Sequence, residues 1–227
     1  IYVASPGMEA LCAHLAEEIS VTIDTEIVSC KRKKNAWQPV KANGDFLEEF
    51  DWIVSAAPPH HSLSWAPEFF ADGITFDHVR LRGCYSLMLG FEDAVPVSWQ
   101  GAFVRNSPIG WMAVNSHKYG REGGPSLLVQ CSGEWTEEHL ECASENIEVM
   151  LSNELKNLTG IDITSAKHCE LFRWQYASIA VPLGLDCLFD PEAQLAACGD
   201  WCIKGRVEGA FKSADALAAR LFAVLPQ

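Results

Sequence analysis

The sequence is short of positive charge, with 17 Lys and Arg residues against 30 Asp and Glu and a formal net charge of −13 at pH 7. A surface that follows nucleic-acid phosphates needs an excess of cations. The sequence also lacks any apolar run near the ~18 residues of a membrane-spanning helix, and it shows no signal peptide. We therefore expect neither nucleic acid nor a membrane as a partner.

Motifs of several known enzyme chemistries are missing as well. There is no G-x-S-x-G nucleophile elbow, and no cysteine has a His and an Asn at a known catalytic spacing. Cys198 and Cys202 form a C-x-x-x-C spacing without a second pair, so no metal site is predicted. A G-x-G-x-x-G run, which holds a dinucleotide pyrophosphate, is absent too, because Gly123-Gly124-Pro125 has the wrong spacing.

What the sequence does contain is apolar residues, 48% of its 227 positions, enough for one large or two modest domains. Its nine cysteines are odd in number, scattered and mostly embedded in apolar runs. This usage is typical of reduced thiols in a cytosolic protein. The expected location is therefore the cytoplasm.

The clearest local pattern lies near the carboxyl end. A short apolar run over 195–198 predicts a strand, which breaks at Gly199-Asp200, crosses a turn at Gly205 and enters a long helix at about Arg206. The predicted buried stripe of this helix is Val207, Ala210, Phe211, Ala214, Leu217, Ala218, Leu221, Phe222 and Leu225. The unpaired N–H groups of its first turn would hold an anion or an electron-poor ring carbonyl.

The first part of the chain predicts a helix, a meander and a strand. The helix follows Pro6-Gly7, and its predicted buried stripe is Met8, Leu11, Cys12, Leu15, Ala16 and Ile19. Strands are expected over 21–30, 37–40 and 46–50, and the basic run 31–34 is expected at a solvated hairpin tip. A further apolar strand over 51–57 ends in small residues, which let backbone approach a ligand.

The middle of the chain predicts a separate sheet with one helix. A loop or short helix is expected over 60–70, and closely spaced strands, which favour antiparallel pairing, over 81–92, 99–104, 110–115 and 126–132. A helix capped by Thr136 and ended by Gly160 should follow, with a strand over 166–177 and a loop over 181–194.

The carboxyl-terminal pattern, GD followed by GRVEGA, resembles the flavin-binding segment of the FAD-dependent amine oxidase superfamily, and most of all its renalase-like oxidoreductases. The resemblance implies FAD as cofactor, with Gly199 and Asp200 near its pyrophosphate and ribityl chain. It places the first helical turn, Arg206, Val207 and Glu208, at the N1/C2=O edge of the isoalloxazine ring. It also places Val28 near the adenine. On this segment alone, an ordinary capped loop is the alternative.

The same resemblance extends to the middle of the chain. The segment from Trp99 to Trp111 is similar to the renalase-like pattern of a tryptophan, a glycine and a later GW, and residues 172–177 resemble an HRW-x-YA strand. It implies a substrate pocket lined by Trp99, Trp111, Arg173, Trp174 and Tyr176. Trp111 and Trp174 suit a core as well as a pocket wall. Arg173, a charge in an apolar strand, should have a carboxylate or a dinucleotide phosphate as partner.

The implied fold is α/β, with an α+β insertion: a partial, Rossmann-like FAD-binding domain at 1–59, a mostly antiparallel substrate domain at 60–190, and an FAD-contacting strand and helix at 191–227. The missing glycine-rich unit predicts the C-terminal portion of a longer flavoprotein, which would not hold FAD by itself. The implied function is hydride transfer from a small reduced nitrogen-containing molecule, an amine or a dihydronicotinamide, to FAD and then to oxygen. No residue is singled out as catalytic, because the flavin accepts the hydride. The alternative is a non-catalytic module that binds a ligand or a partner. The sequence leaves the oligomeric state open.

Overall fold

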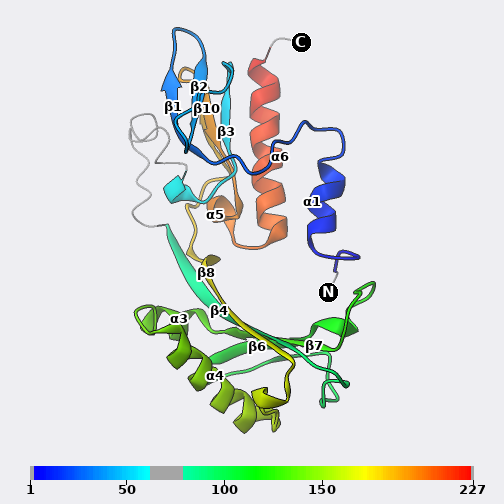
Figure 1. The fold of residues 1–227 in the computed structure, drawn as a ribbon. Coiled ribbons are helices and arrows are strands. Elements are labelled where there is room, and N and C mark those ends of the chain that lie inside the picture. Colours follow the sequence, from blue (N-terminus) through cyan, green and yellow to red (C-terminus); the bar gives the residue numbers. More distant parts are fainter. Residues whose placement is uncertain (1–2, 62–78, 226–227) are drawn as a thin grey trace. The chain divides into compact units, whose positions relative to one another are not determined.

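The computed structural model of the chain describes residues 3–61 and 79–225 (Figure 1). They form two compact units, a five-strand unit (residues 1–21 and 82–177) and a C-terminal unit (residues 22–81 and 178–227). The predicted loop or short helix over 60–70 lies outside the described residues from residue 62 on. The domain bounds proposed from the sequence, 1–59, 60–190 and 191–227, stay a prediction.

In the C-terminal unit, a hairpin comes first. Strands β1 (Ile27–Arg32) and β2 (Trp37–Lys41) pair antiparallel. Its tip carries the basic run, as predicted, and the turn after β2 contains Gly44 at φ 89°, a conformation that favours glycine. Isolated bridges join Phe46 to Val40 and Phe50 to Trp37, so the third predicted meander strand is present only as single pairings.

A three-stranded sheet carries the core of this unit. Strand β10 (Leu195–Ala197) lies in its centre, parallel to β3 (Ile53–Ser55) and antiparallel to β9 (Leu188–Asp190). The parallel pair agrees with the predicted α/β class. Strand β9 falls in a segment predicted as loop, and it forms because every one of its residues pairs with β10.

Two helices follow β10, α5 (Asp200–Ile203) and α6 (Val207–Val224). The start of α6 was predicted at about Arg206 and is confirmed. Its predicted buried stripe is wrong in large part: Val207, Phe211 and Phe222 are 60%, 63% and 75% exposed. Leu217 is buried as predicted, and the helix buries Gly209 and Ser213 with it, because small residues let its backbone approach the sheet.

The five-strand unit is built on an antiparallel sheet, as predicted. Its strands are β4 (Arg80–Gly90), β5 (Gly101–Phe103), β6 (Ile109–Val114), β7 (Ser126–Cys131) and β8 (His168–Val181). They are ordered β5-β6-β7-β4-β8. Short 3₁₀ turns, η2 (Asn115–His117) and η3 (Ile163–Ser165), follow β6 and precede β8.

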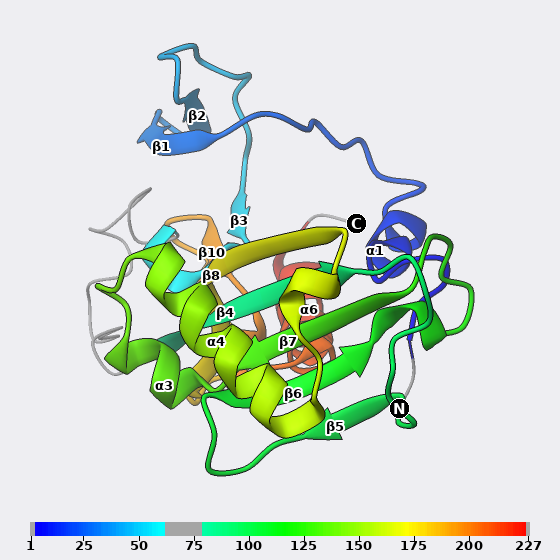
Figure 2. The same ribbon diagram turned by 60° about the horizontal axis from the view of Figure 1, so that its bottom comes forward.

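One face of this sheet is covered by α4 (Ser144–Thr159), which buries Ile147, Leu151 and Leu155 against it (Figure 2). Gly160, at φ 78°, ends the helix as predicted. The predicted cap is wrong. Ser132 caps a separate short helix, α3 (Gly133–Glu138), and Thr136 is buried within α3.

Helix α1 (Glu9–Leu15) also belongs to this unit, and none of its residues is buried. Its predicted buried stripe is therefore wrong: Met8, Leu15 and Ile19 are 47%, 59% and 64% exposed. The apolar period identifies the face that a partner surface would cover, but the described residues do not cover it. Within the described ranges, no helix combines the length and the low polarity needed to cross a membrane.

Candidate functional site

The segment from β10 to α6 is held together by a few short contacts. The Gly199 N–H donates to the Ser213 hydroxyl at 3.0 Å, and this hydroxyl donates to the Asp186 carbonyl at 2.6 Å. Gly199 leaves no room for a side chain, because a Cβ there would overlap the Trp201 indole ring. The end of β10 is thus fixed to the middle of α6, and half-buried Asp200 begins α5 directly behind it.

The start of α6 is positioned by a second close approach. A Cβ on Gly209 would collide with the backbone carbonyl of Lys204, and one on Gly205 would come within 3.1 Å of the Ile179 side chain. The two glycines therefore let the turn lie directly against the first turn of the helix and against β8.

Arg206 precedes the helix in a conformation that side chains rarely adopt. Its φ is 115° and its ψ 158°, and its side chain is exposed and makes no capping hydrogen bond. Strained backbone at a non-glycine residue is concentrated at functional sites. The Arg206 carbonyl accepts from Gly209 and Ala210 at 2.9 and 3.2 Å, which leaves the N–H groups of Val207 and Glu208 without an acceptor inside the helix.

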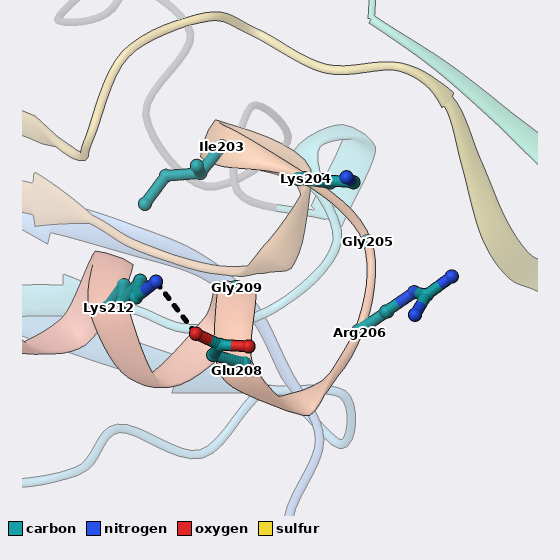
Figure 3. A pocket seen from close by; sticks show the side chains of 7 residues that line it. All are labelled: Ile203, Lys204, Gly205, Arg206, Glu208, Gly209 and Lys212. Atoms are coloured by element: carbon teal, nitrogen blue, oxygen red, sulfur yellow. Dashed lines mark ion pairs between the residues drawn. The ribbon is translucent and has the colours of Figure 1, made fainter.

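A pocket of about 250 Å³ opens at this turn (Figure 3). It is lined by Ile203, Lys204, Gly205, Arg206, Glu208, Gly209 and Lys212. Lys212 and Glu208 form an ion pair at 2.7 Å, and the hydrogen bond from Lys212 lowers the pKa of the Glu208 carboxyl. Arg206 points away from that pair. The helix dipole and the cations of Lys204 and Arg206 give the turn a positive character that suits an anion or the carbonyl oxygen of an electron-poor ring.

Of the predicted cofactor residues, Arg206 and Glu208 line this pocket, and Val207 lies between them in the chain without lining it. Gly199 and Asp200 lie one short helix upstream and do not line the pocket. Val28 lies on β1, is 43% exposed and does not line it either. The roles of these residues stay predictions.

In the five-strand unit, the face of the sheet away from α4 holds most of the predicted substrate residues. Side chains alternate along a strand, and Leu171 of β8 and Met112 of β6 pack into the core beneath α4. Trp174 and Tyr176 on β8 and Trp111 on β6 consequently lie on the other face, which we call the open face. Trp174 and Tyr176 are 51% and 39% exposed.

Aromatic rings gather at both edges of the open face. On β8, the Phe172 and Trp174 ring centroids are 4.6 Å apart, and at the far edge Trp111 lies 4.4 Å from Phe103, its partner across β5 and β6. The two edges are separated by β7 and β4, about 14 Å across three strand spacings. The open face is thus a wide surface with aromatic side chains along both of its edges.

Two of the predicted substrate residues do not lie on the open face. Trp99 is half-buried and packs against the core beneath α4. Arg173 alternates with Phe172 and Trp174, so it lies on the opposite face of β8, where it is exposed. Within the described part of the chain, none of the ion pairs involves Arg173, so the partner expected for it is not found among those residues.

Sequence reasoning missed a pocket of about 370 Å³ at one end of the sheet. Its lining is mainly apolar, from Met88, Leu89, Gly90, Leu127 and Leu128, with Asn115, Ser126 and His168 as polar groups. Met88 and Leu128 pair across β4 and β7, so they share one face. The alternation of side chains along β4 could have indicated that Met88 faces away from the core. That Met88 lies beside Leu128 follows only from the pairing of β4 with β7.

The turn after β6 connects this end of the sheet to the start of the chain. Lys118 donates to the Asn115 side-chain oxygen at 2.8 Å, and burial, followed by the charge of Arg121, lowers the pKa of its ammonium. Arg121 donates to the carbonyls of Ala4 and Pro6. The arginine therefore has a structural role, which is to hold the segment before α1.

Comparison with known proteins identifies the fold. No family model matches the chain. It superposes on a protein assigned as a protoporphyrinogen oxidase from Exiguobacterium sp. 255-15 with a TM-score of 0.71 and 12% identity, over 96% of this chain and 51% of that one. It also superposes on a putrescine oxidase bound to putrescine, with a TM-score of 0.67 and 13% identity over 96% of this chain and 53% of that one. A double mutant from a redesign of cofactor binding in putrescine oxidase gives a TM-score of 0.69 and 14% identity, with the same shares of the two chains covered.

The chain thus has a mixed α/β fold found in oxidases, and it spans about half the length of the structures that it matches.

Proposed function

We propose that this chain is part of a flavin-dependent oxidoreductase, which takes a hydride from a reduced nitrogen-containing molecule, an amine or a dihydronicotinamide, and passes the electrons to oxygen. The observation that carries the proposal is the start of α6, where two N–H groups have no acceptor inside the helix and a strained Arg206 follows a central strand. The likeness to oxidases over 96% of the chain supports it, as does the GD…GRVEGA pattern.

The residues at the start of α6 fit the edge of a flavin ring. FAD, when bound, supplies the hydride acceptor. The N–H groups of Val207 and Glu208 would donate to ring acceptors, and the dipole of α6 with the Arg206 guanidinium would stabilise negative charge there. Gly205 and Gly209 hold the turn in place, because side chains at these positions would push it from the helix.

The open face fits a substrate that is largely apolar and carries one polar nitrogen. The aromatic side chains along its edges and the Met88–Leu128 pair can exclude water, while Asn115, Ser126 and His168 offer hydrogen-bond partners at the pocket's edge. We assign the substrate wall to this face and name no catalytic acid or base. The renalase-like specificity rests on the sequence pattern alone, and a cytosolic location rests on the unpaired cysteines.

A non-catalytic binding module is the second candidate. The exposed apolar side chains of α6, Val207, Phe211 and Phe222, and the aromatic rings of β8 would suit a partner surface. The two candidates differ in one observable, because only an oxidoreductase transfers electrons from substrate to a bound flavin.

The assigned contact is tested by Val207→Pro in the complete protein. Proline is tolerated at the first helical position and removes only an N–H group that the helix does not use. We expect flavin reduction by substrate, measured by stopped-flow absorbance, to slow by about 100-fold, as when one preorganised donor is lost.

Val207→Ala is the matched control, because it removes the same exposed side chain and keeps the N–H group. Its rate of flavin reduction should stay near that of the wild type. Equal rates for the proline and alanine variants, with flavin still bound, would show that the Val207 N–H group does not contact the ring.

A further inference from the structure

Three buried thiols lie next to the proposed cofactor segment and have no role in it. Cys187 precedes β9, Cys198 follows β10, and Cys202 is in α5; they are 3%, 6% and 0% exposed, and all three are free. The described residues contain no group of three His, Cys, Asp or Glu side chains that could hold a metal ion. Their arrangement points instead to chemistry between two of them.

Strand register places Cys187 opposite Cys198. Strands β9 and β10 pair Asp190 with Leu195, Phe189 with Ala196 and Leu188 with Ala197, where the ladder ends. Extending this register by one residue places Cys187 opposite Cys198. Opposed residues of antiparallel strands have Cα atoms about 4.5–5.5 Å apart. This spacing lies within the range of about 4.4–6.8 Å that a disulfide spans.

Both side chains also point to the same side of the sheet. Cys187, Cys198 and Ala196 form one buried cluster with Leu217 of α6, whereas Leu188, Leu195 and Ala197 belong to the cluster on the other side. Cys202 is part of that second cluster. Of the three thiols, only Cys187 and Cys198 therefore flank the same end of the β9–β10 pair and lie on the same face.

Cys84 and Cys131 in the five-strand unit show what such a pairing requires. The Cys84 thiol lies 3.5 Å from the Cys131 carbonyl, so the two residues are neighbours. Cys131 packs into the core beneath α4 together with Tyr85, the residue next to Cys84. Because neighbours in a strand point to opposite faces, the two sulfur atoms lie on different sides of the sheet and cannot join.

We propose that Cys187 and Cys198 form a cross-strand disulfide when the protein meets a peroxide. One thiolate attacks the peroxide and becomes a sulfenic acid, releasing water, and the second thiol displaces the remaining hydroxyl as a second water. The two thiols lose two electrons, the peroxide gains them as its O–O bond breaks, and an S–S bond replaces two S–H bonds. The proposal does not rest on the proposed function, because peroxide can be added.

The thiols of Cys187 and Cys198 should react slowly with peroxide. Burial raises the pKa of both thiols, with Asp186 adding to the rise at Cys187 and Arg220 opposing it, so little thiolate is present at neutral pH. Access requires local opening of β9, which pairs with β10 alone among the strands described. Once formed, the bond ties β9 to β10 one residue before Gly199. Oxidation would thus clamp the strand end that precedes the cofactor segment.

The test is a disulfide map of the full chain after prolonged exposure to hydrogen peroxide, followed by alkylation of the remaining thiols. A protease that cleaves before aspartate separates the three cysteines into residues 186–189, 190–199 and 200–214. We expect a linked pair of the first two fragments, with two of the nine thiols lost to alkylation. A link to the 200–214 fragment, higher oxides alone, or three fully alkylated fragments would overturn the proposal.

Matched variants assign the bond. Cys202→Ser should keep the linked pair of fragments, and Cys187→Ser should lose it and leave Cys198 open to alkylation. Loss of the link in Cys202→Ser, with the variant folded by circular dichroism, would contradict the proposed pair. The disulfide map of the wild-type chain tests the proposal even if neither variant folds.

Discussion

Replacing Trp37 by alanine is expected to lower the free energy of unfolding by about 4 kcal/mol. The side chain is 1% exposed and lies in the core of the C-terminal unit with Leu195 and Trp201. Its indole N–H donates to the Ala193 carbonyl at 2.8 Å, and the Arg32 guanidinium lies 4.8 Å from its ring. Truncation leaves a cavity and removes both interactions, and a urea titration followed by circular dichroism measures the loss.

Trp37→Phe is the control for this prediction. It keeps most of the buried ring and loses the N–H group, while the Ala193 carbonyl still accepts from Arg32 at 2.7 Å. We expect a loss of about 1–2 kcal/mol, the cost of one hydrogen bond and a small volume change. An alanine variant no less stable than the phenylalanine variant would show that Trp37 does not organise this core.

Replacing Gly209 by alanine is expected to destabilise the chain by about 3 kcal/mol, the upper range for overpacking. Helix propensity alone predicts the opposite, because alanine is favoured over glycine by about 1 kcal/mol inside a helix. The difference comes from the Lys204 carbonyl, which occupies the position of a Cβ at Gly209 and belongs to backbone that cannot rotate away. Thermal unfolding of the variant would show the sign directly.

Gly124→Ala provides the comparison. A Cβ there would be 3.7 Å from the Phe91 carbonyl, an ordinary contact, and the glycine has no positive φ. Its stability should stay within about 0.5 kcal/mol of the wild type, as for most surface changes. A Gly209→Ala variant as stable as Gly124→Ala would mean that the Lys204–Gly205 turn does not press on α6.

The sequence predicts those parts of the fold whose signals are local. The strand at 195–197, its break at Gly199 and the helix after Arg206 follow from an apolar run, a glycine and a helical period. The end of α4 at Gly160 follows from the left-handed conformation that glycine adopts at low cost. The alternating, closely spaced strands of the five-strand unit also give its antiparallel pairing.

Other features depend on tertiary contacts that no local pattern contains. On α6, large apolar residues dominate the helical period, but the small side chains of Gly209 and Ser213 decide which face packs. Ser132 and Thr136 are both acceptable caps, and burial of Thr136 inside the unit selects Ser132. Strand β9 exists only through its pairing with β10.

In the candidate site too, some residues could be predicted from local sequence and others depend on tertiary contacts. The residues at the start of α6 could be predicted because they are consecutive in the sequence and are therefore neighbours in the structure. The positive φ of Arg206 could not, since arginine gives no sign of it. The open face combines residues from five strands, and their pairing had to be known before Met88, Leu128 and Trp174 could be placed on one surface.

The central claim, that α6 presents its first turn to a flavin which substrate reduces, is tested most directly by the visible absorption spectrum of the complete protein. We predict the bands of oxidised FAD in the purified protein, and their bleaching when an amine or a dihydronicotinamide is added without oxygen. Admission of oxygen should restore them. A folded complete protein that carries no flavin and takes up none from added FAD would contradict the account.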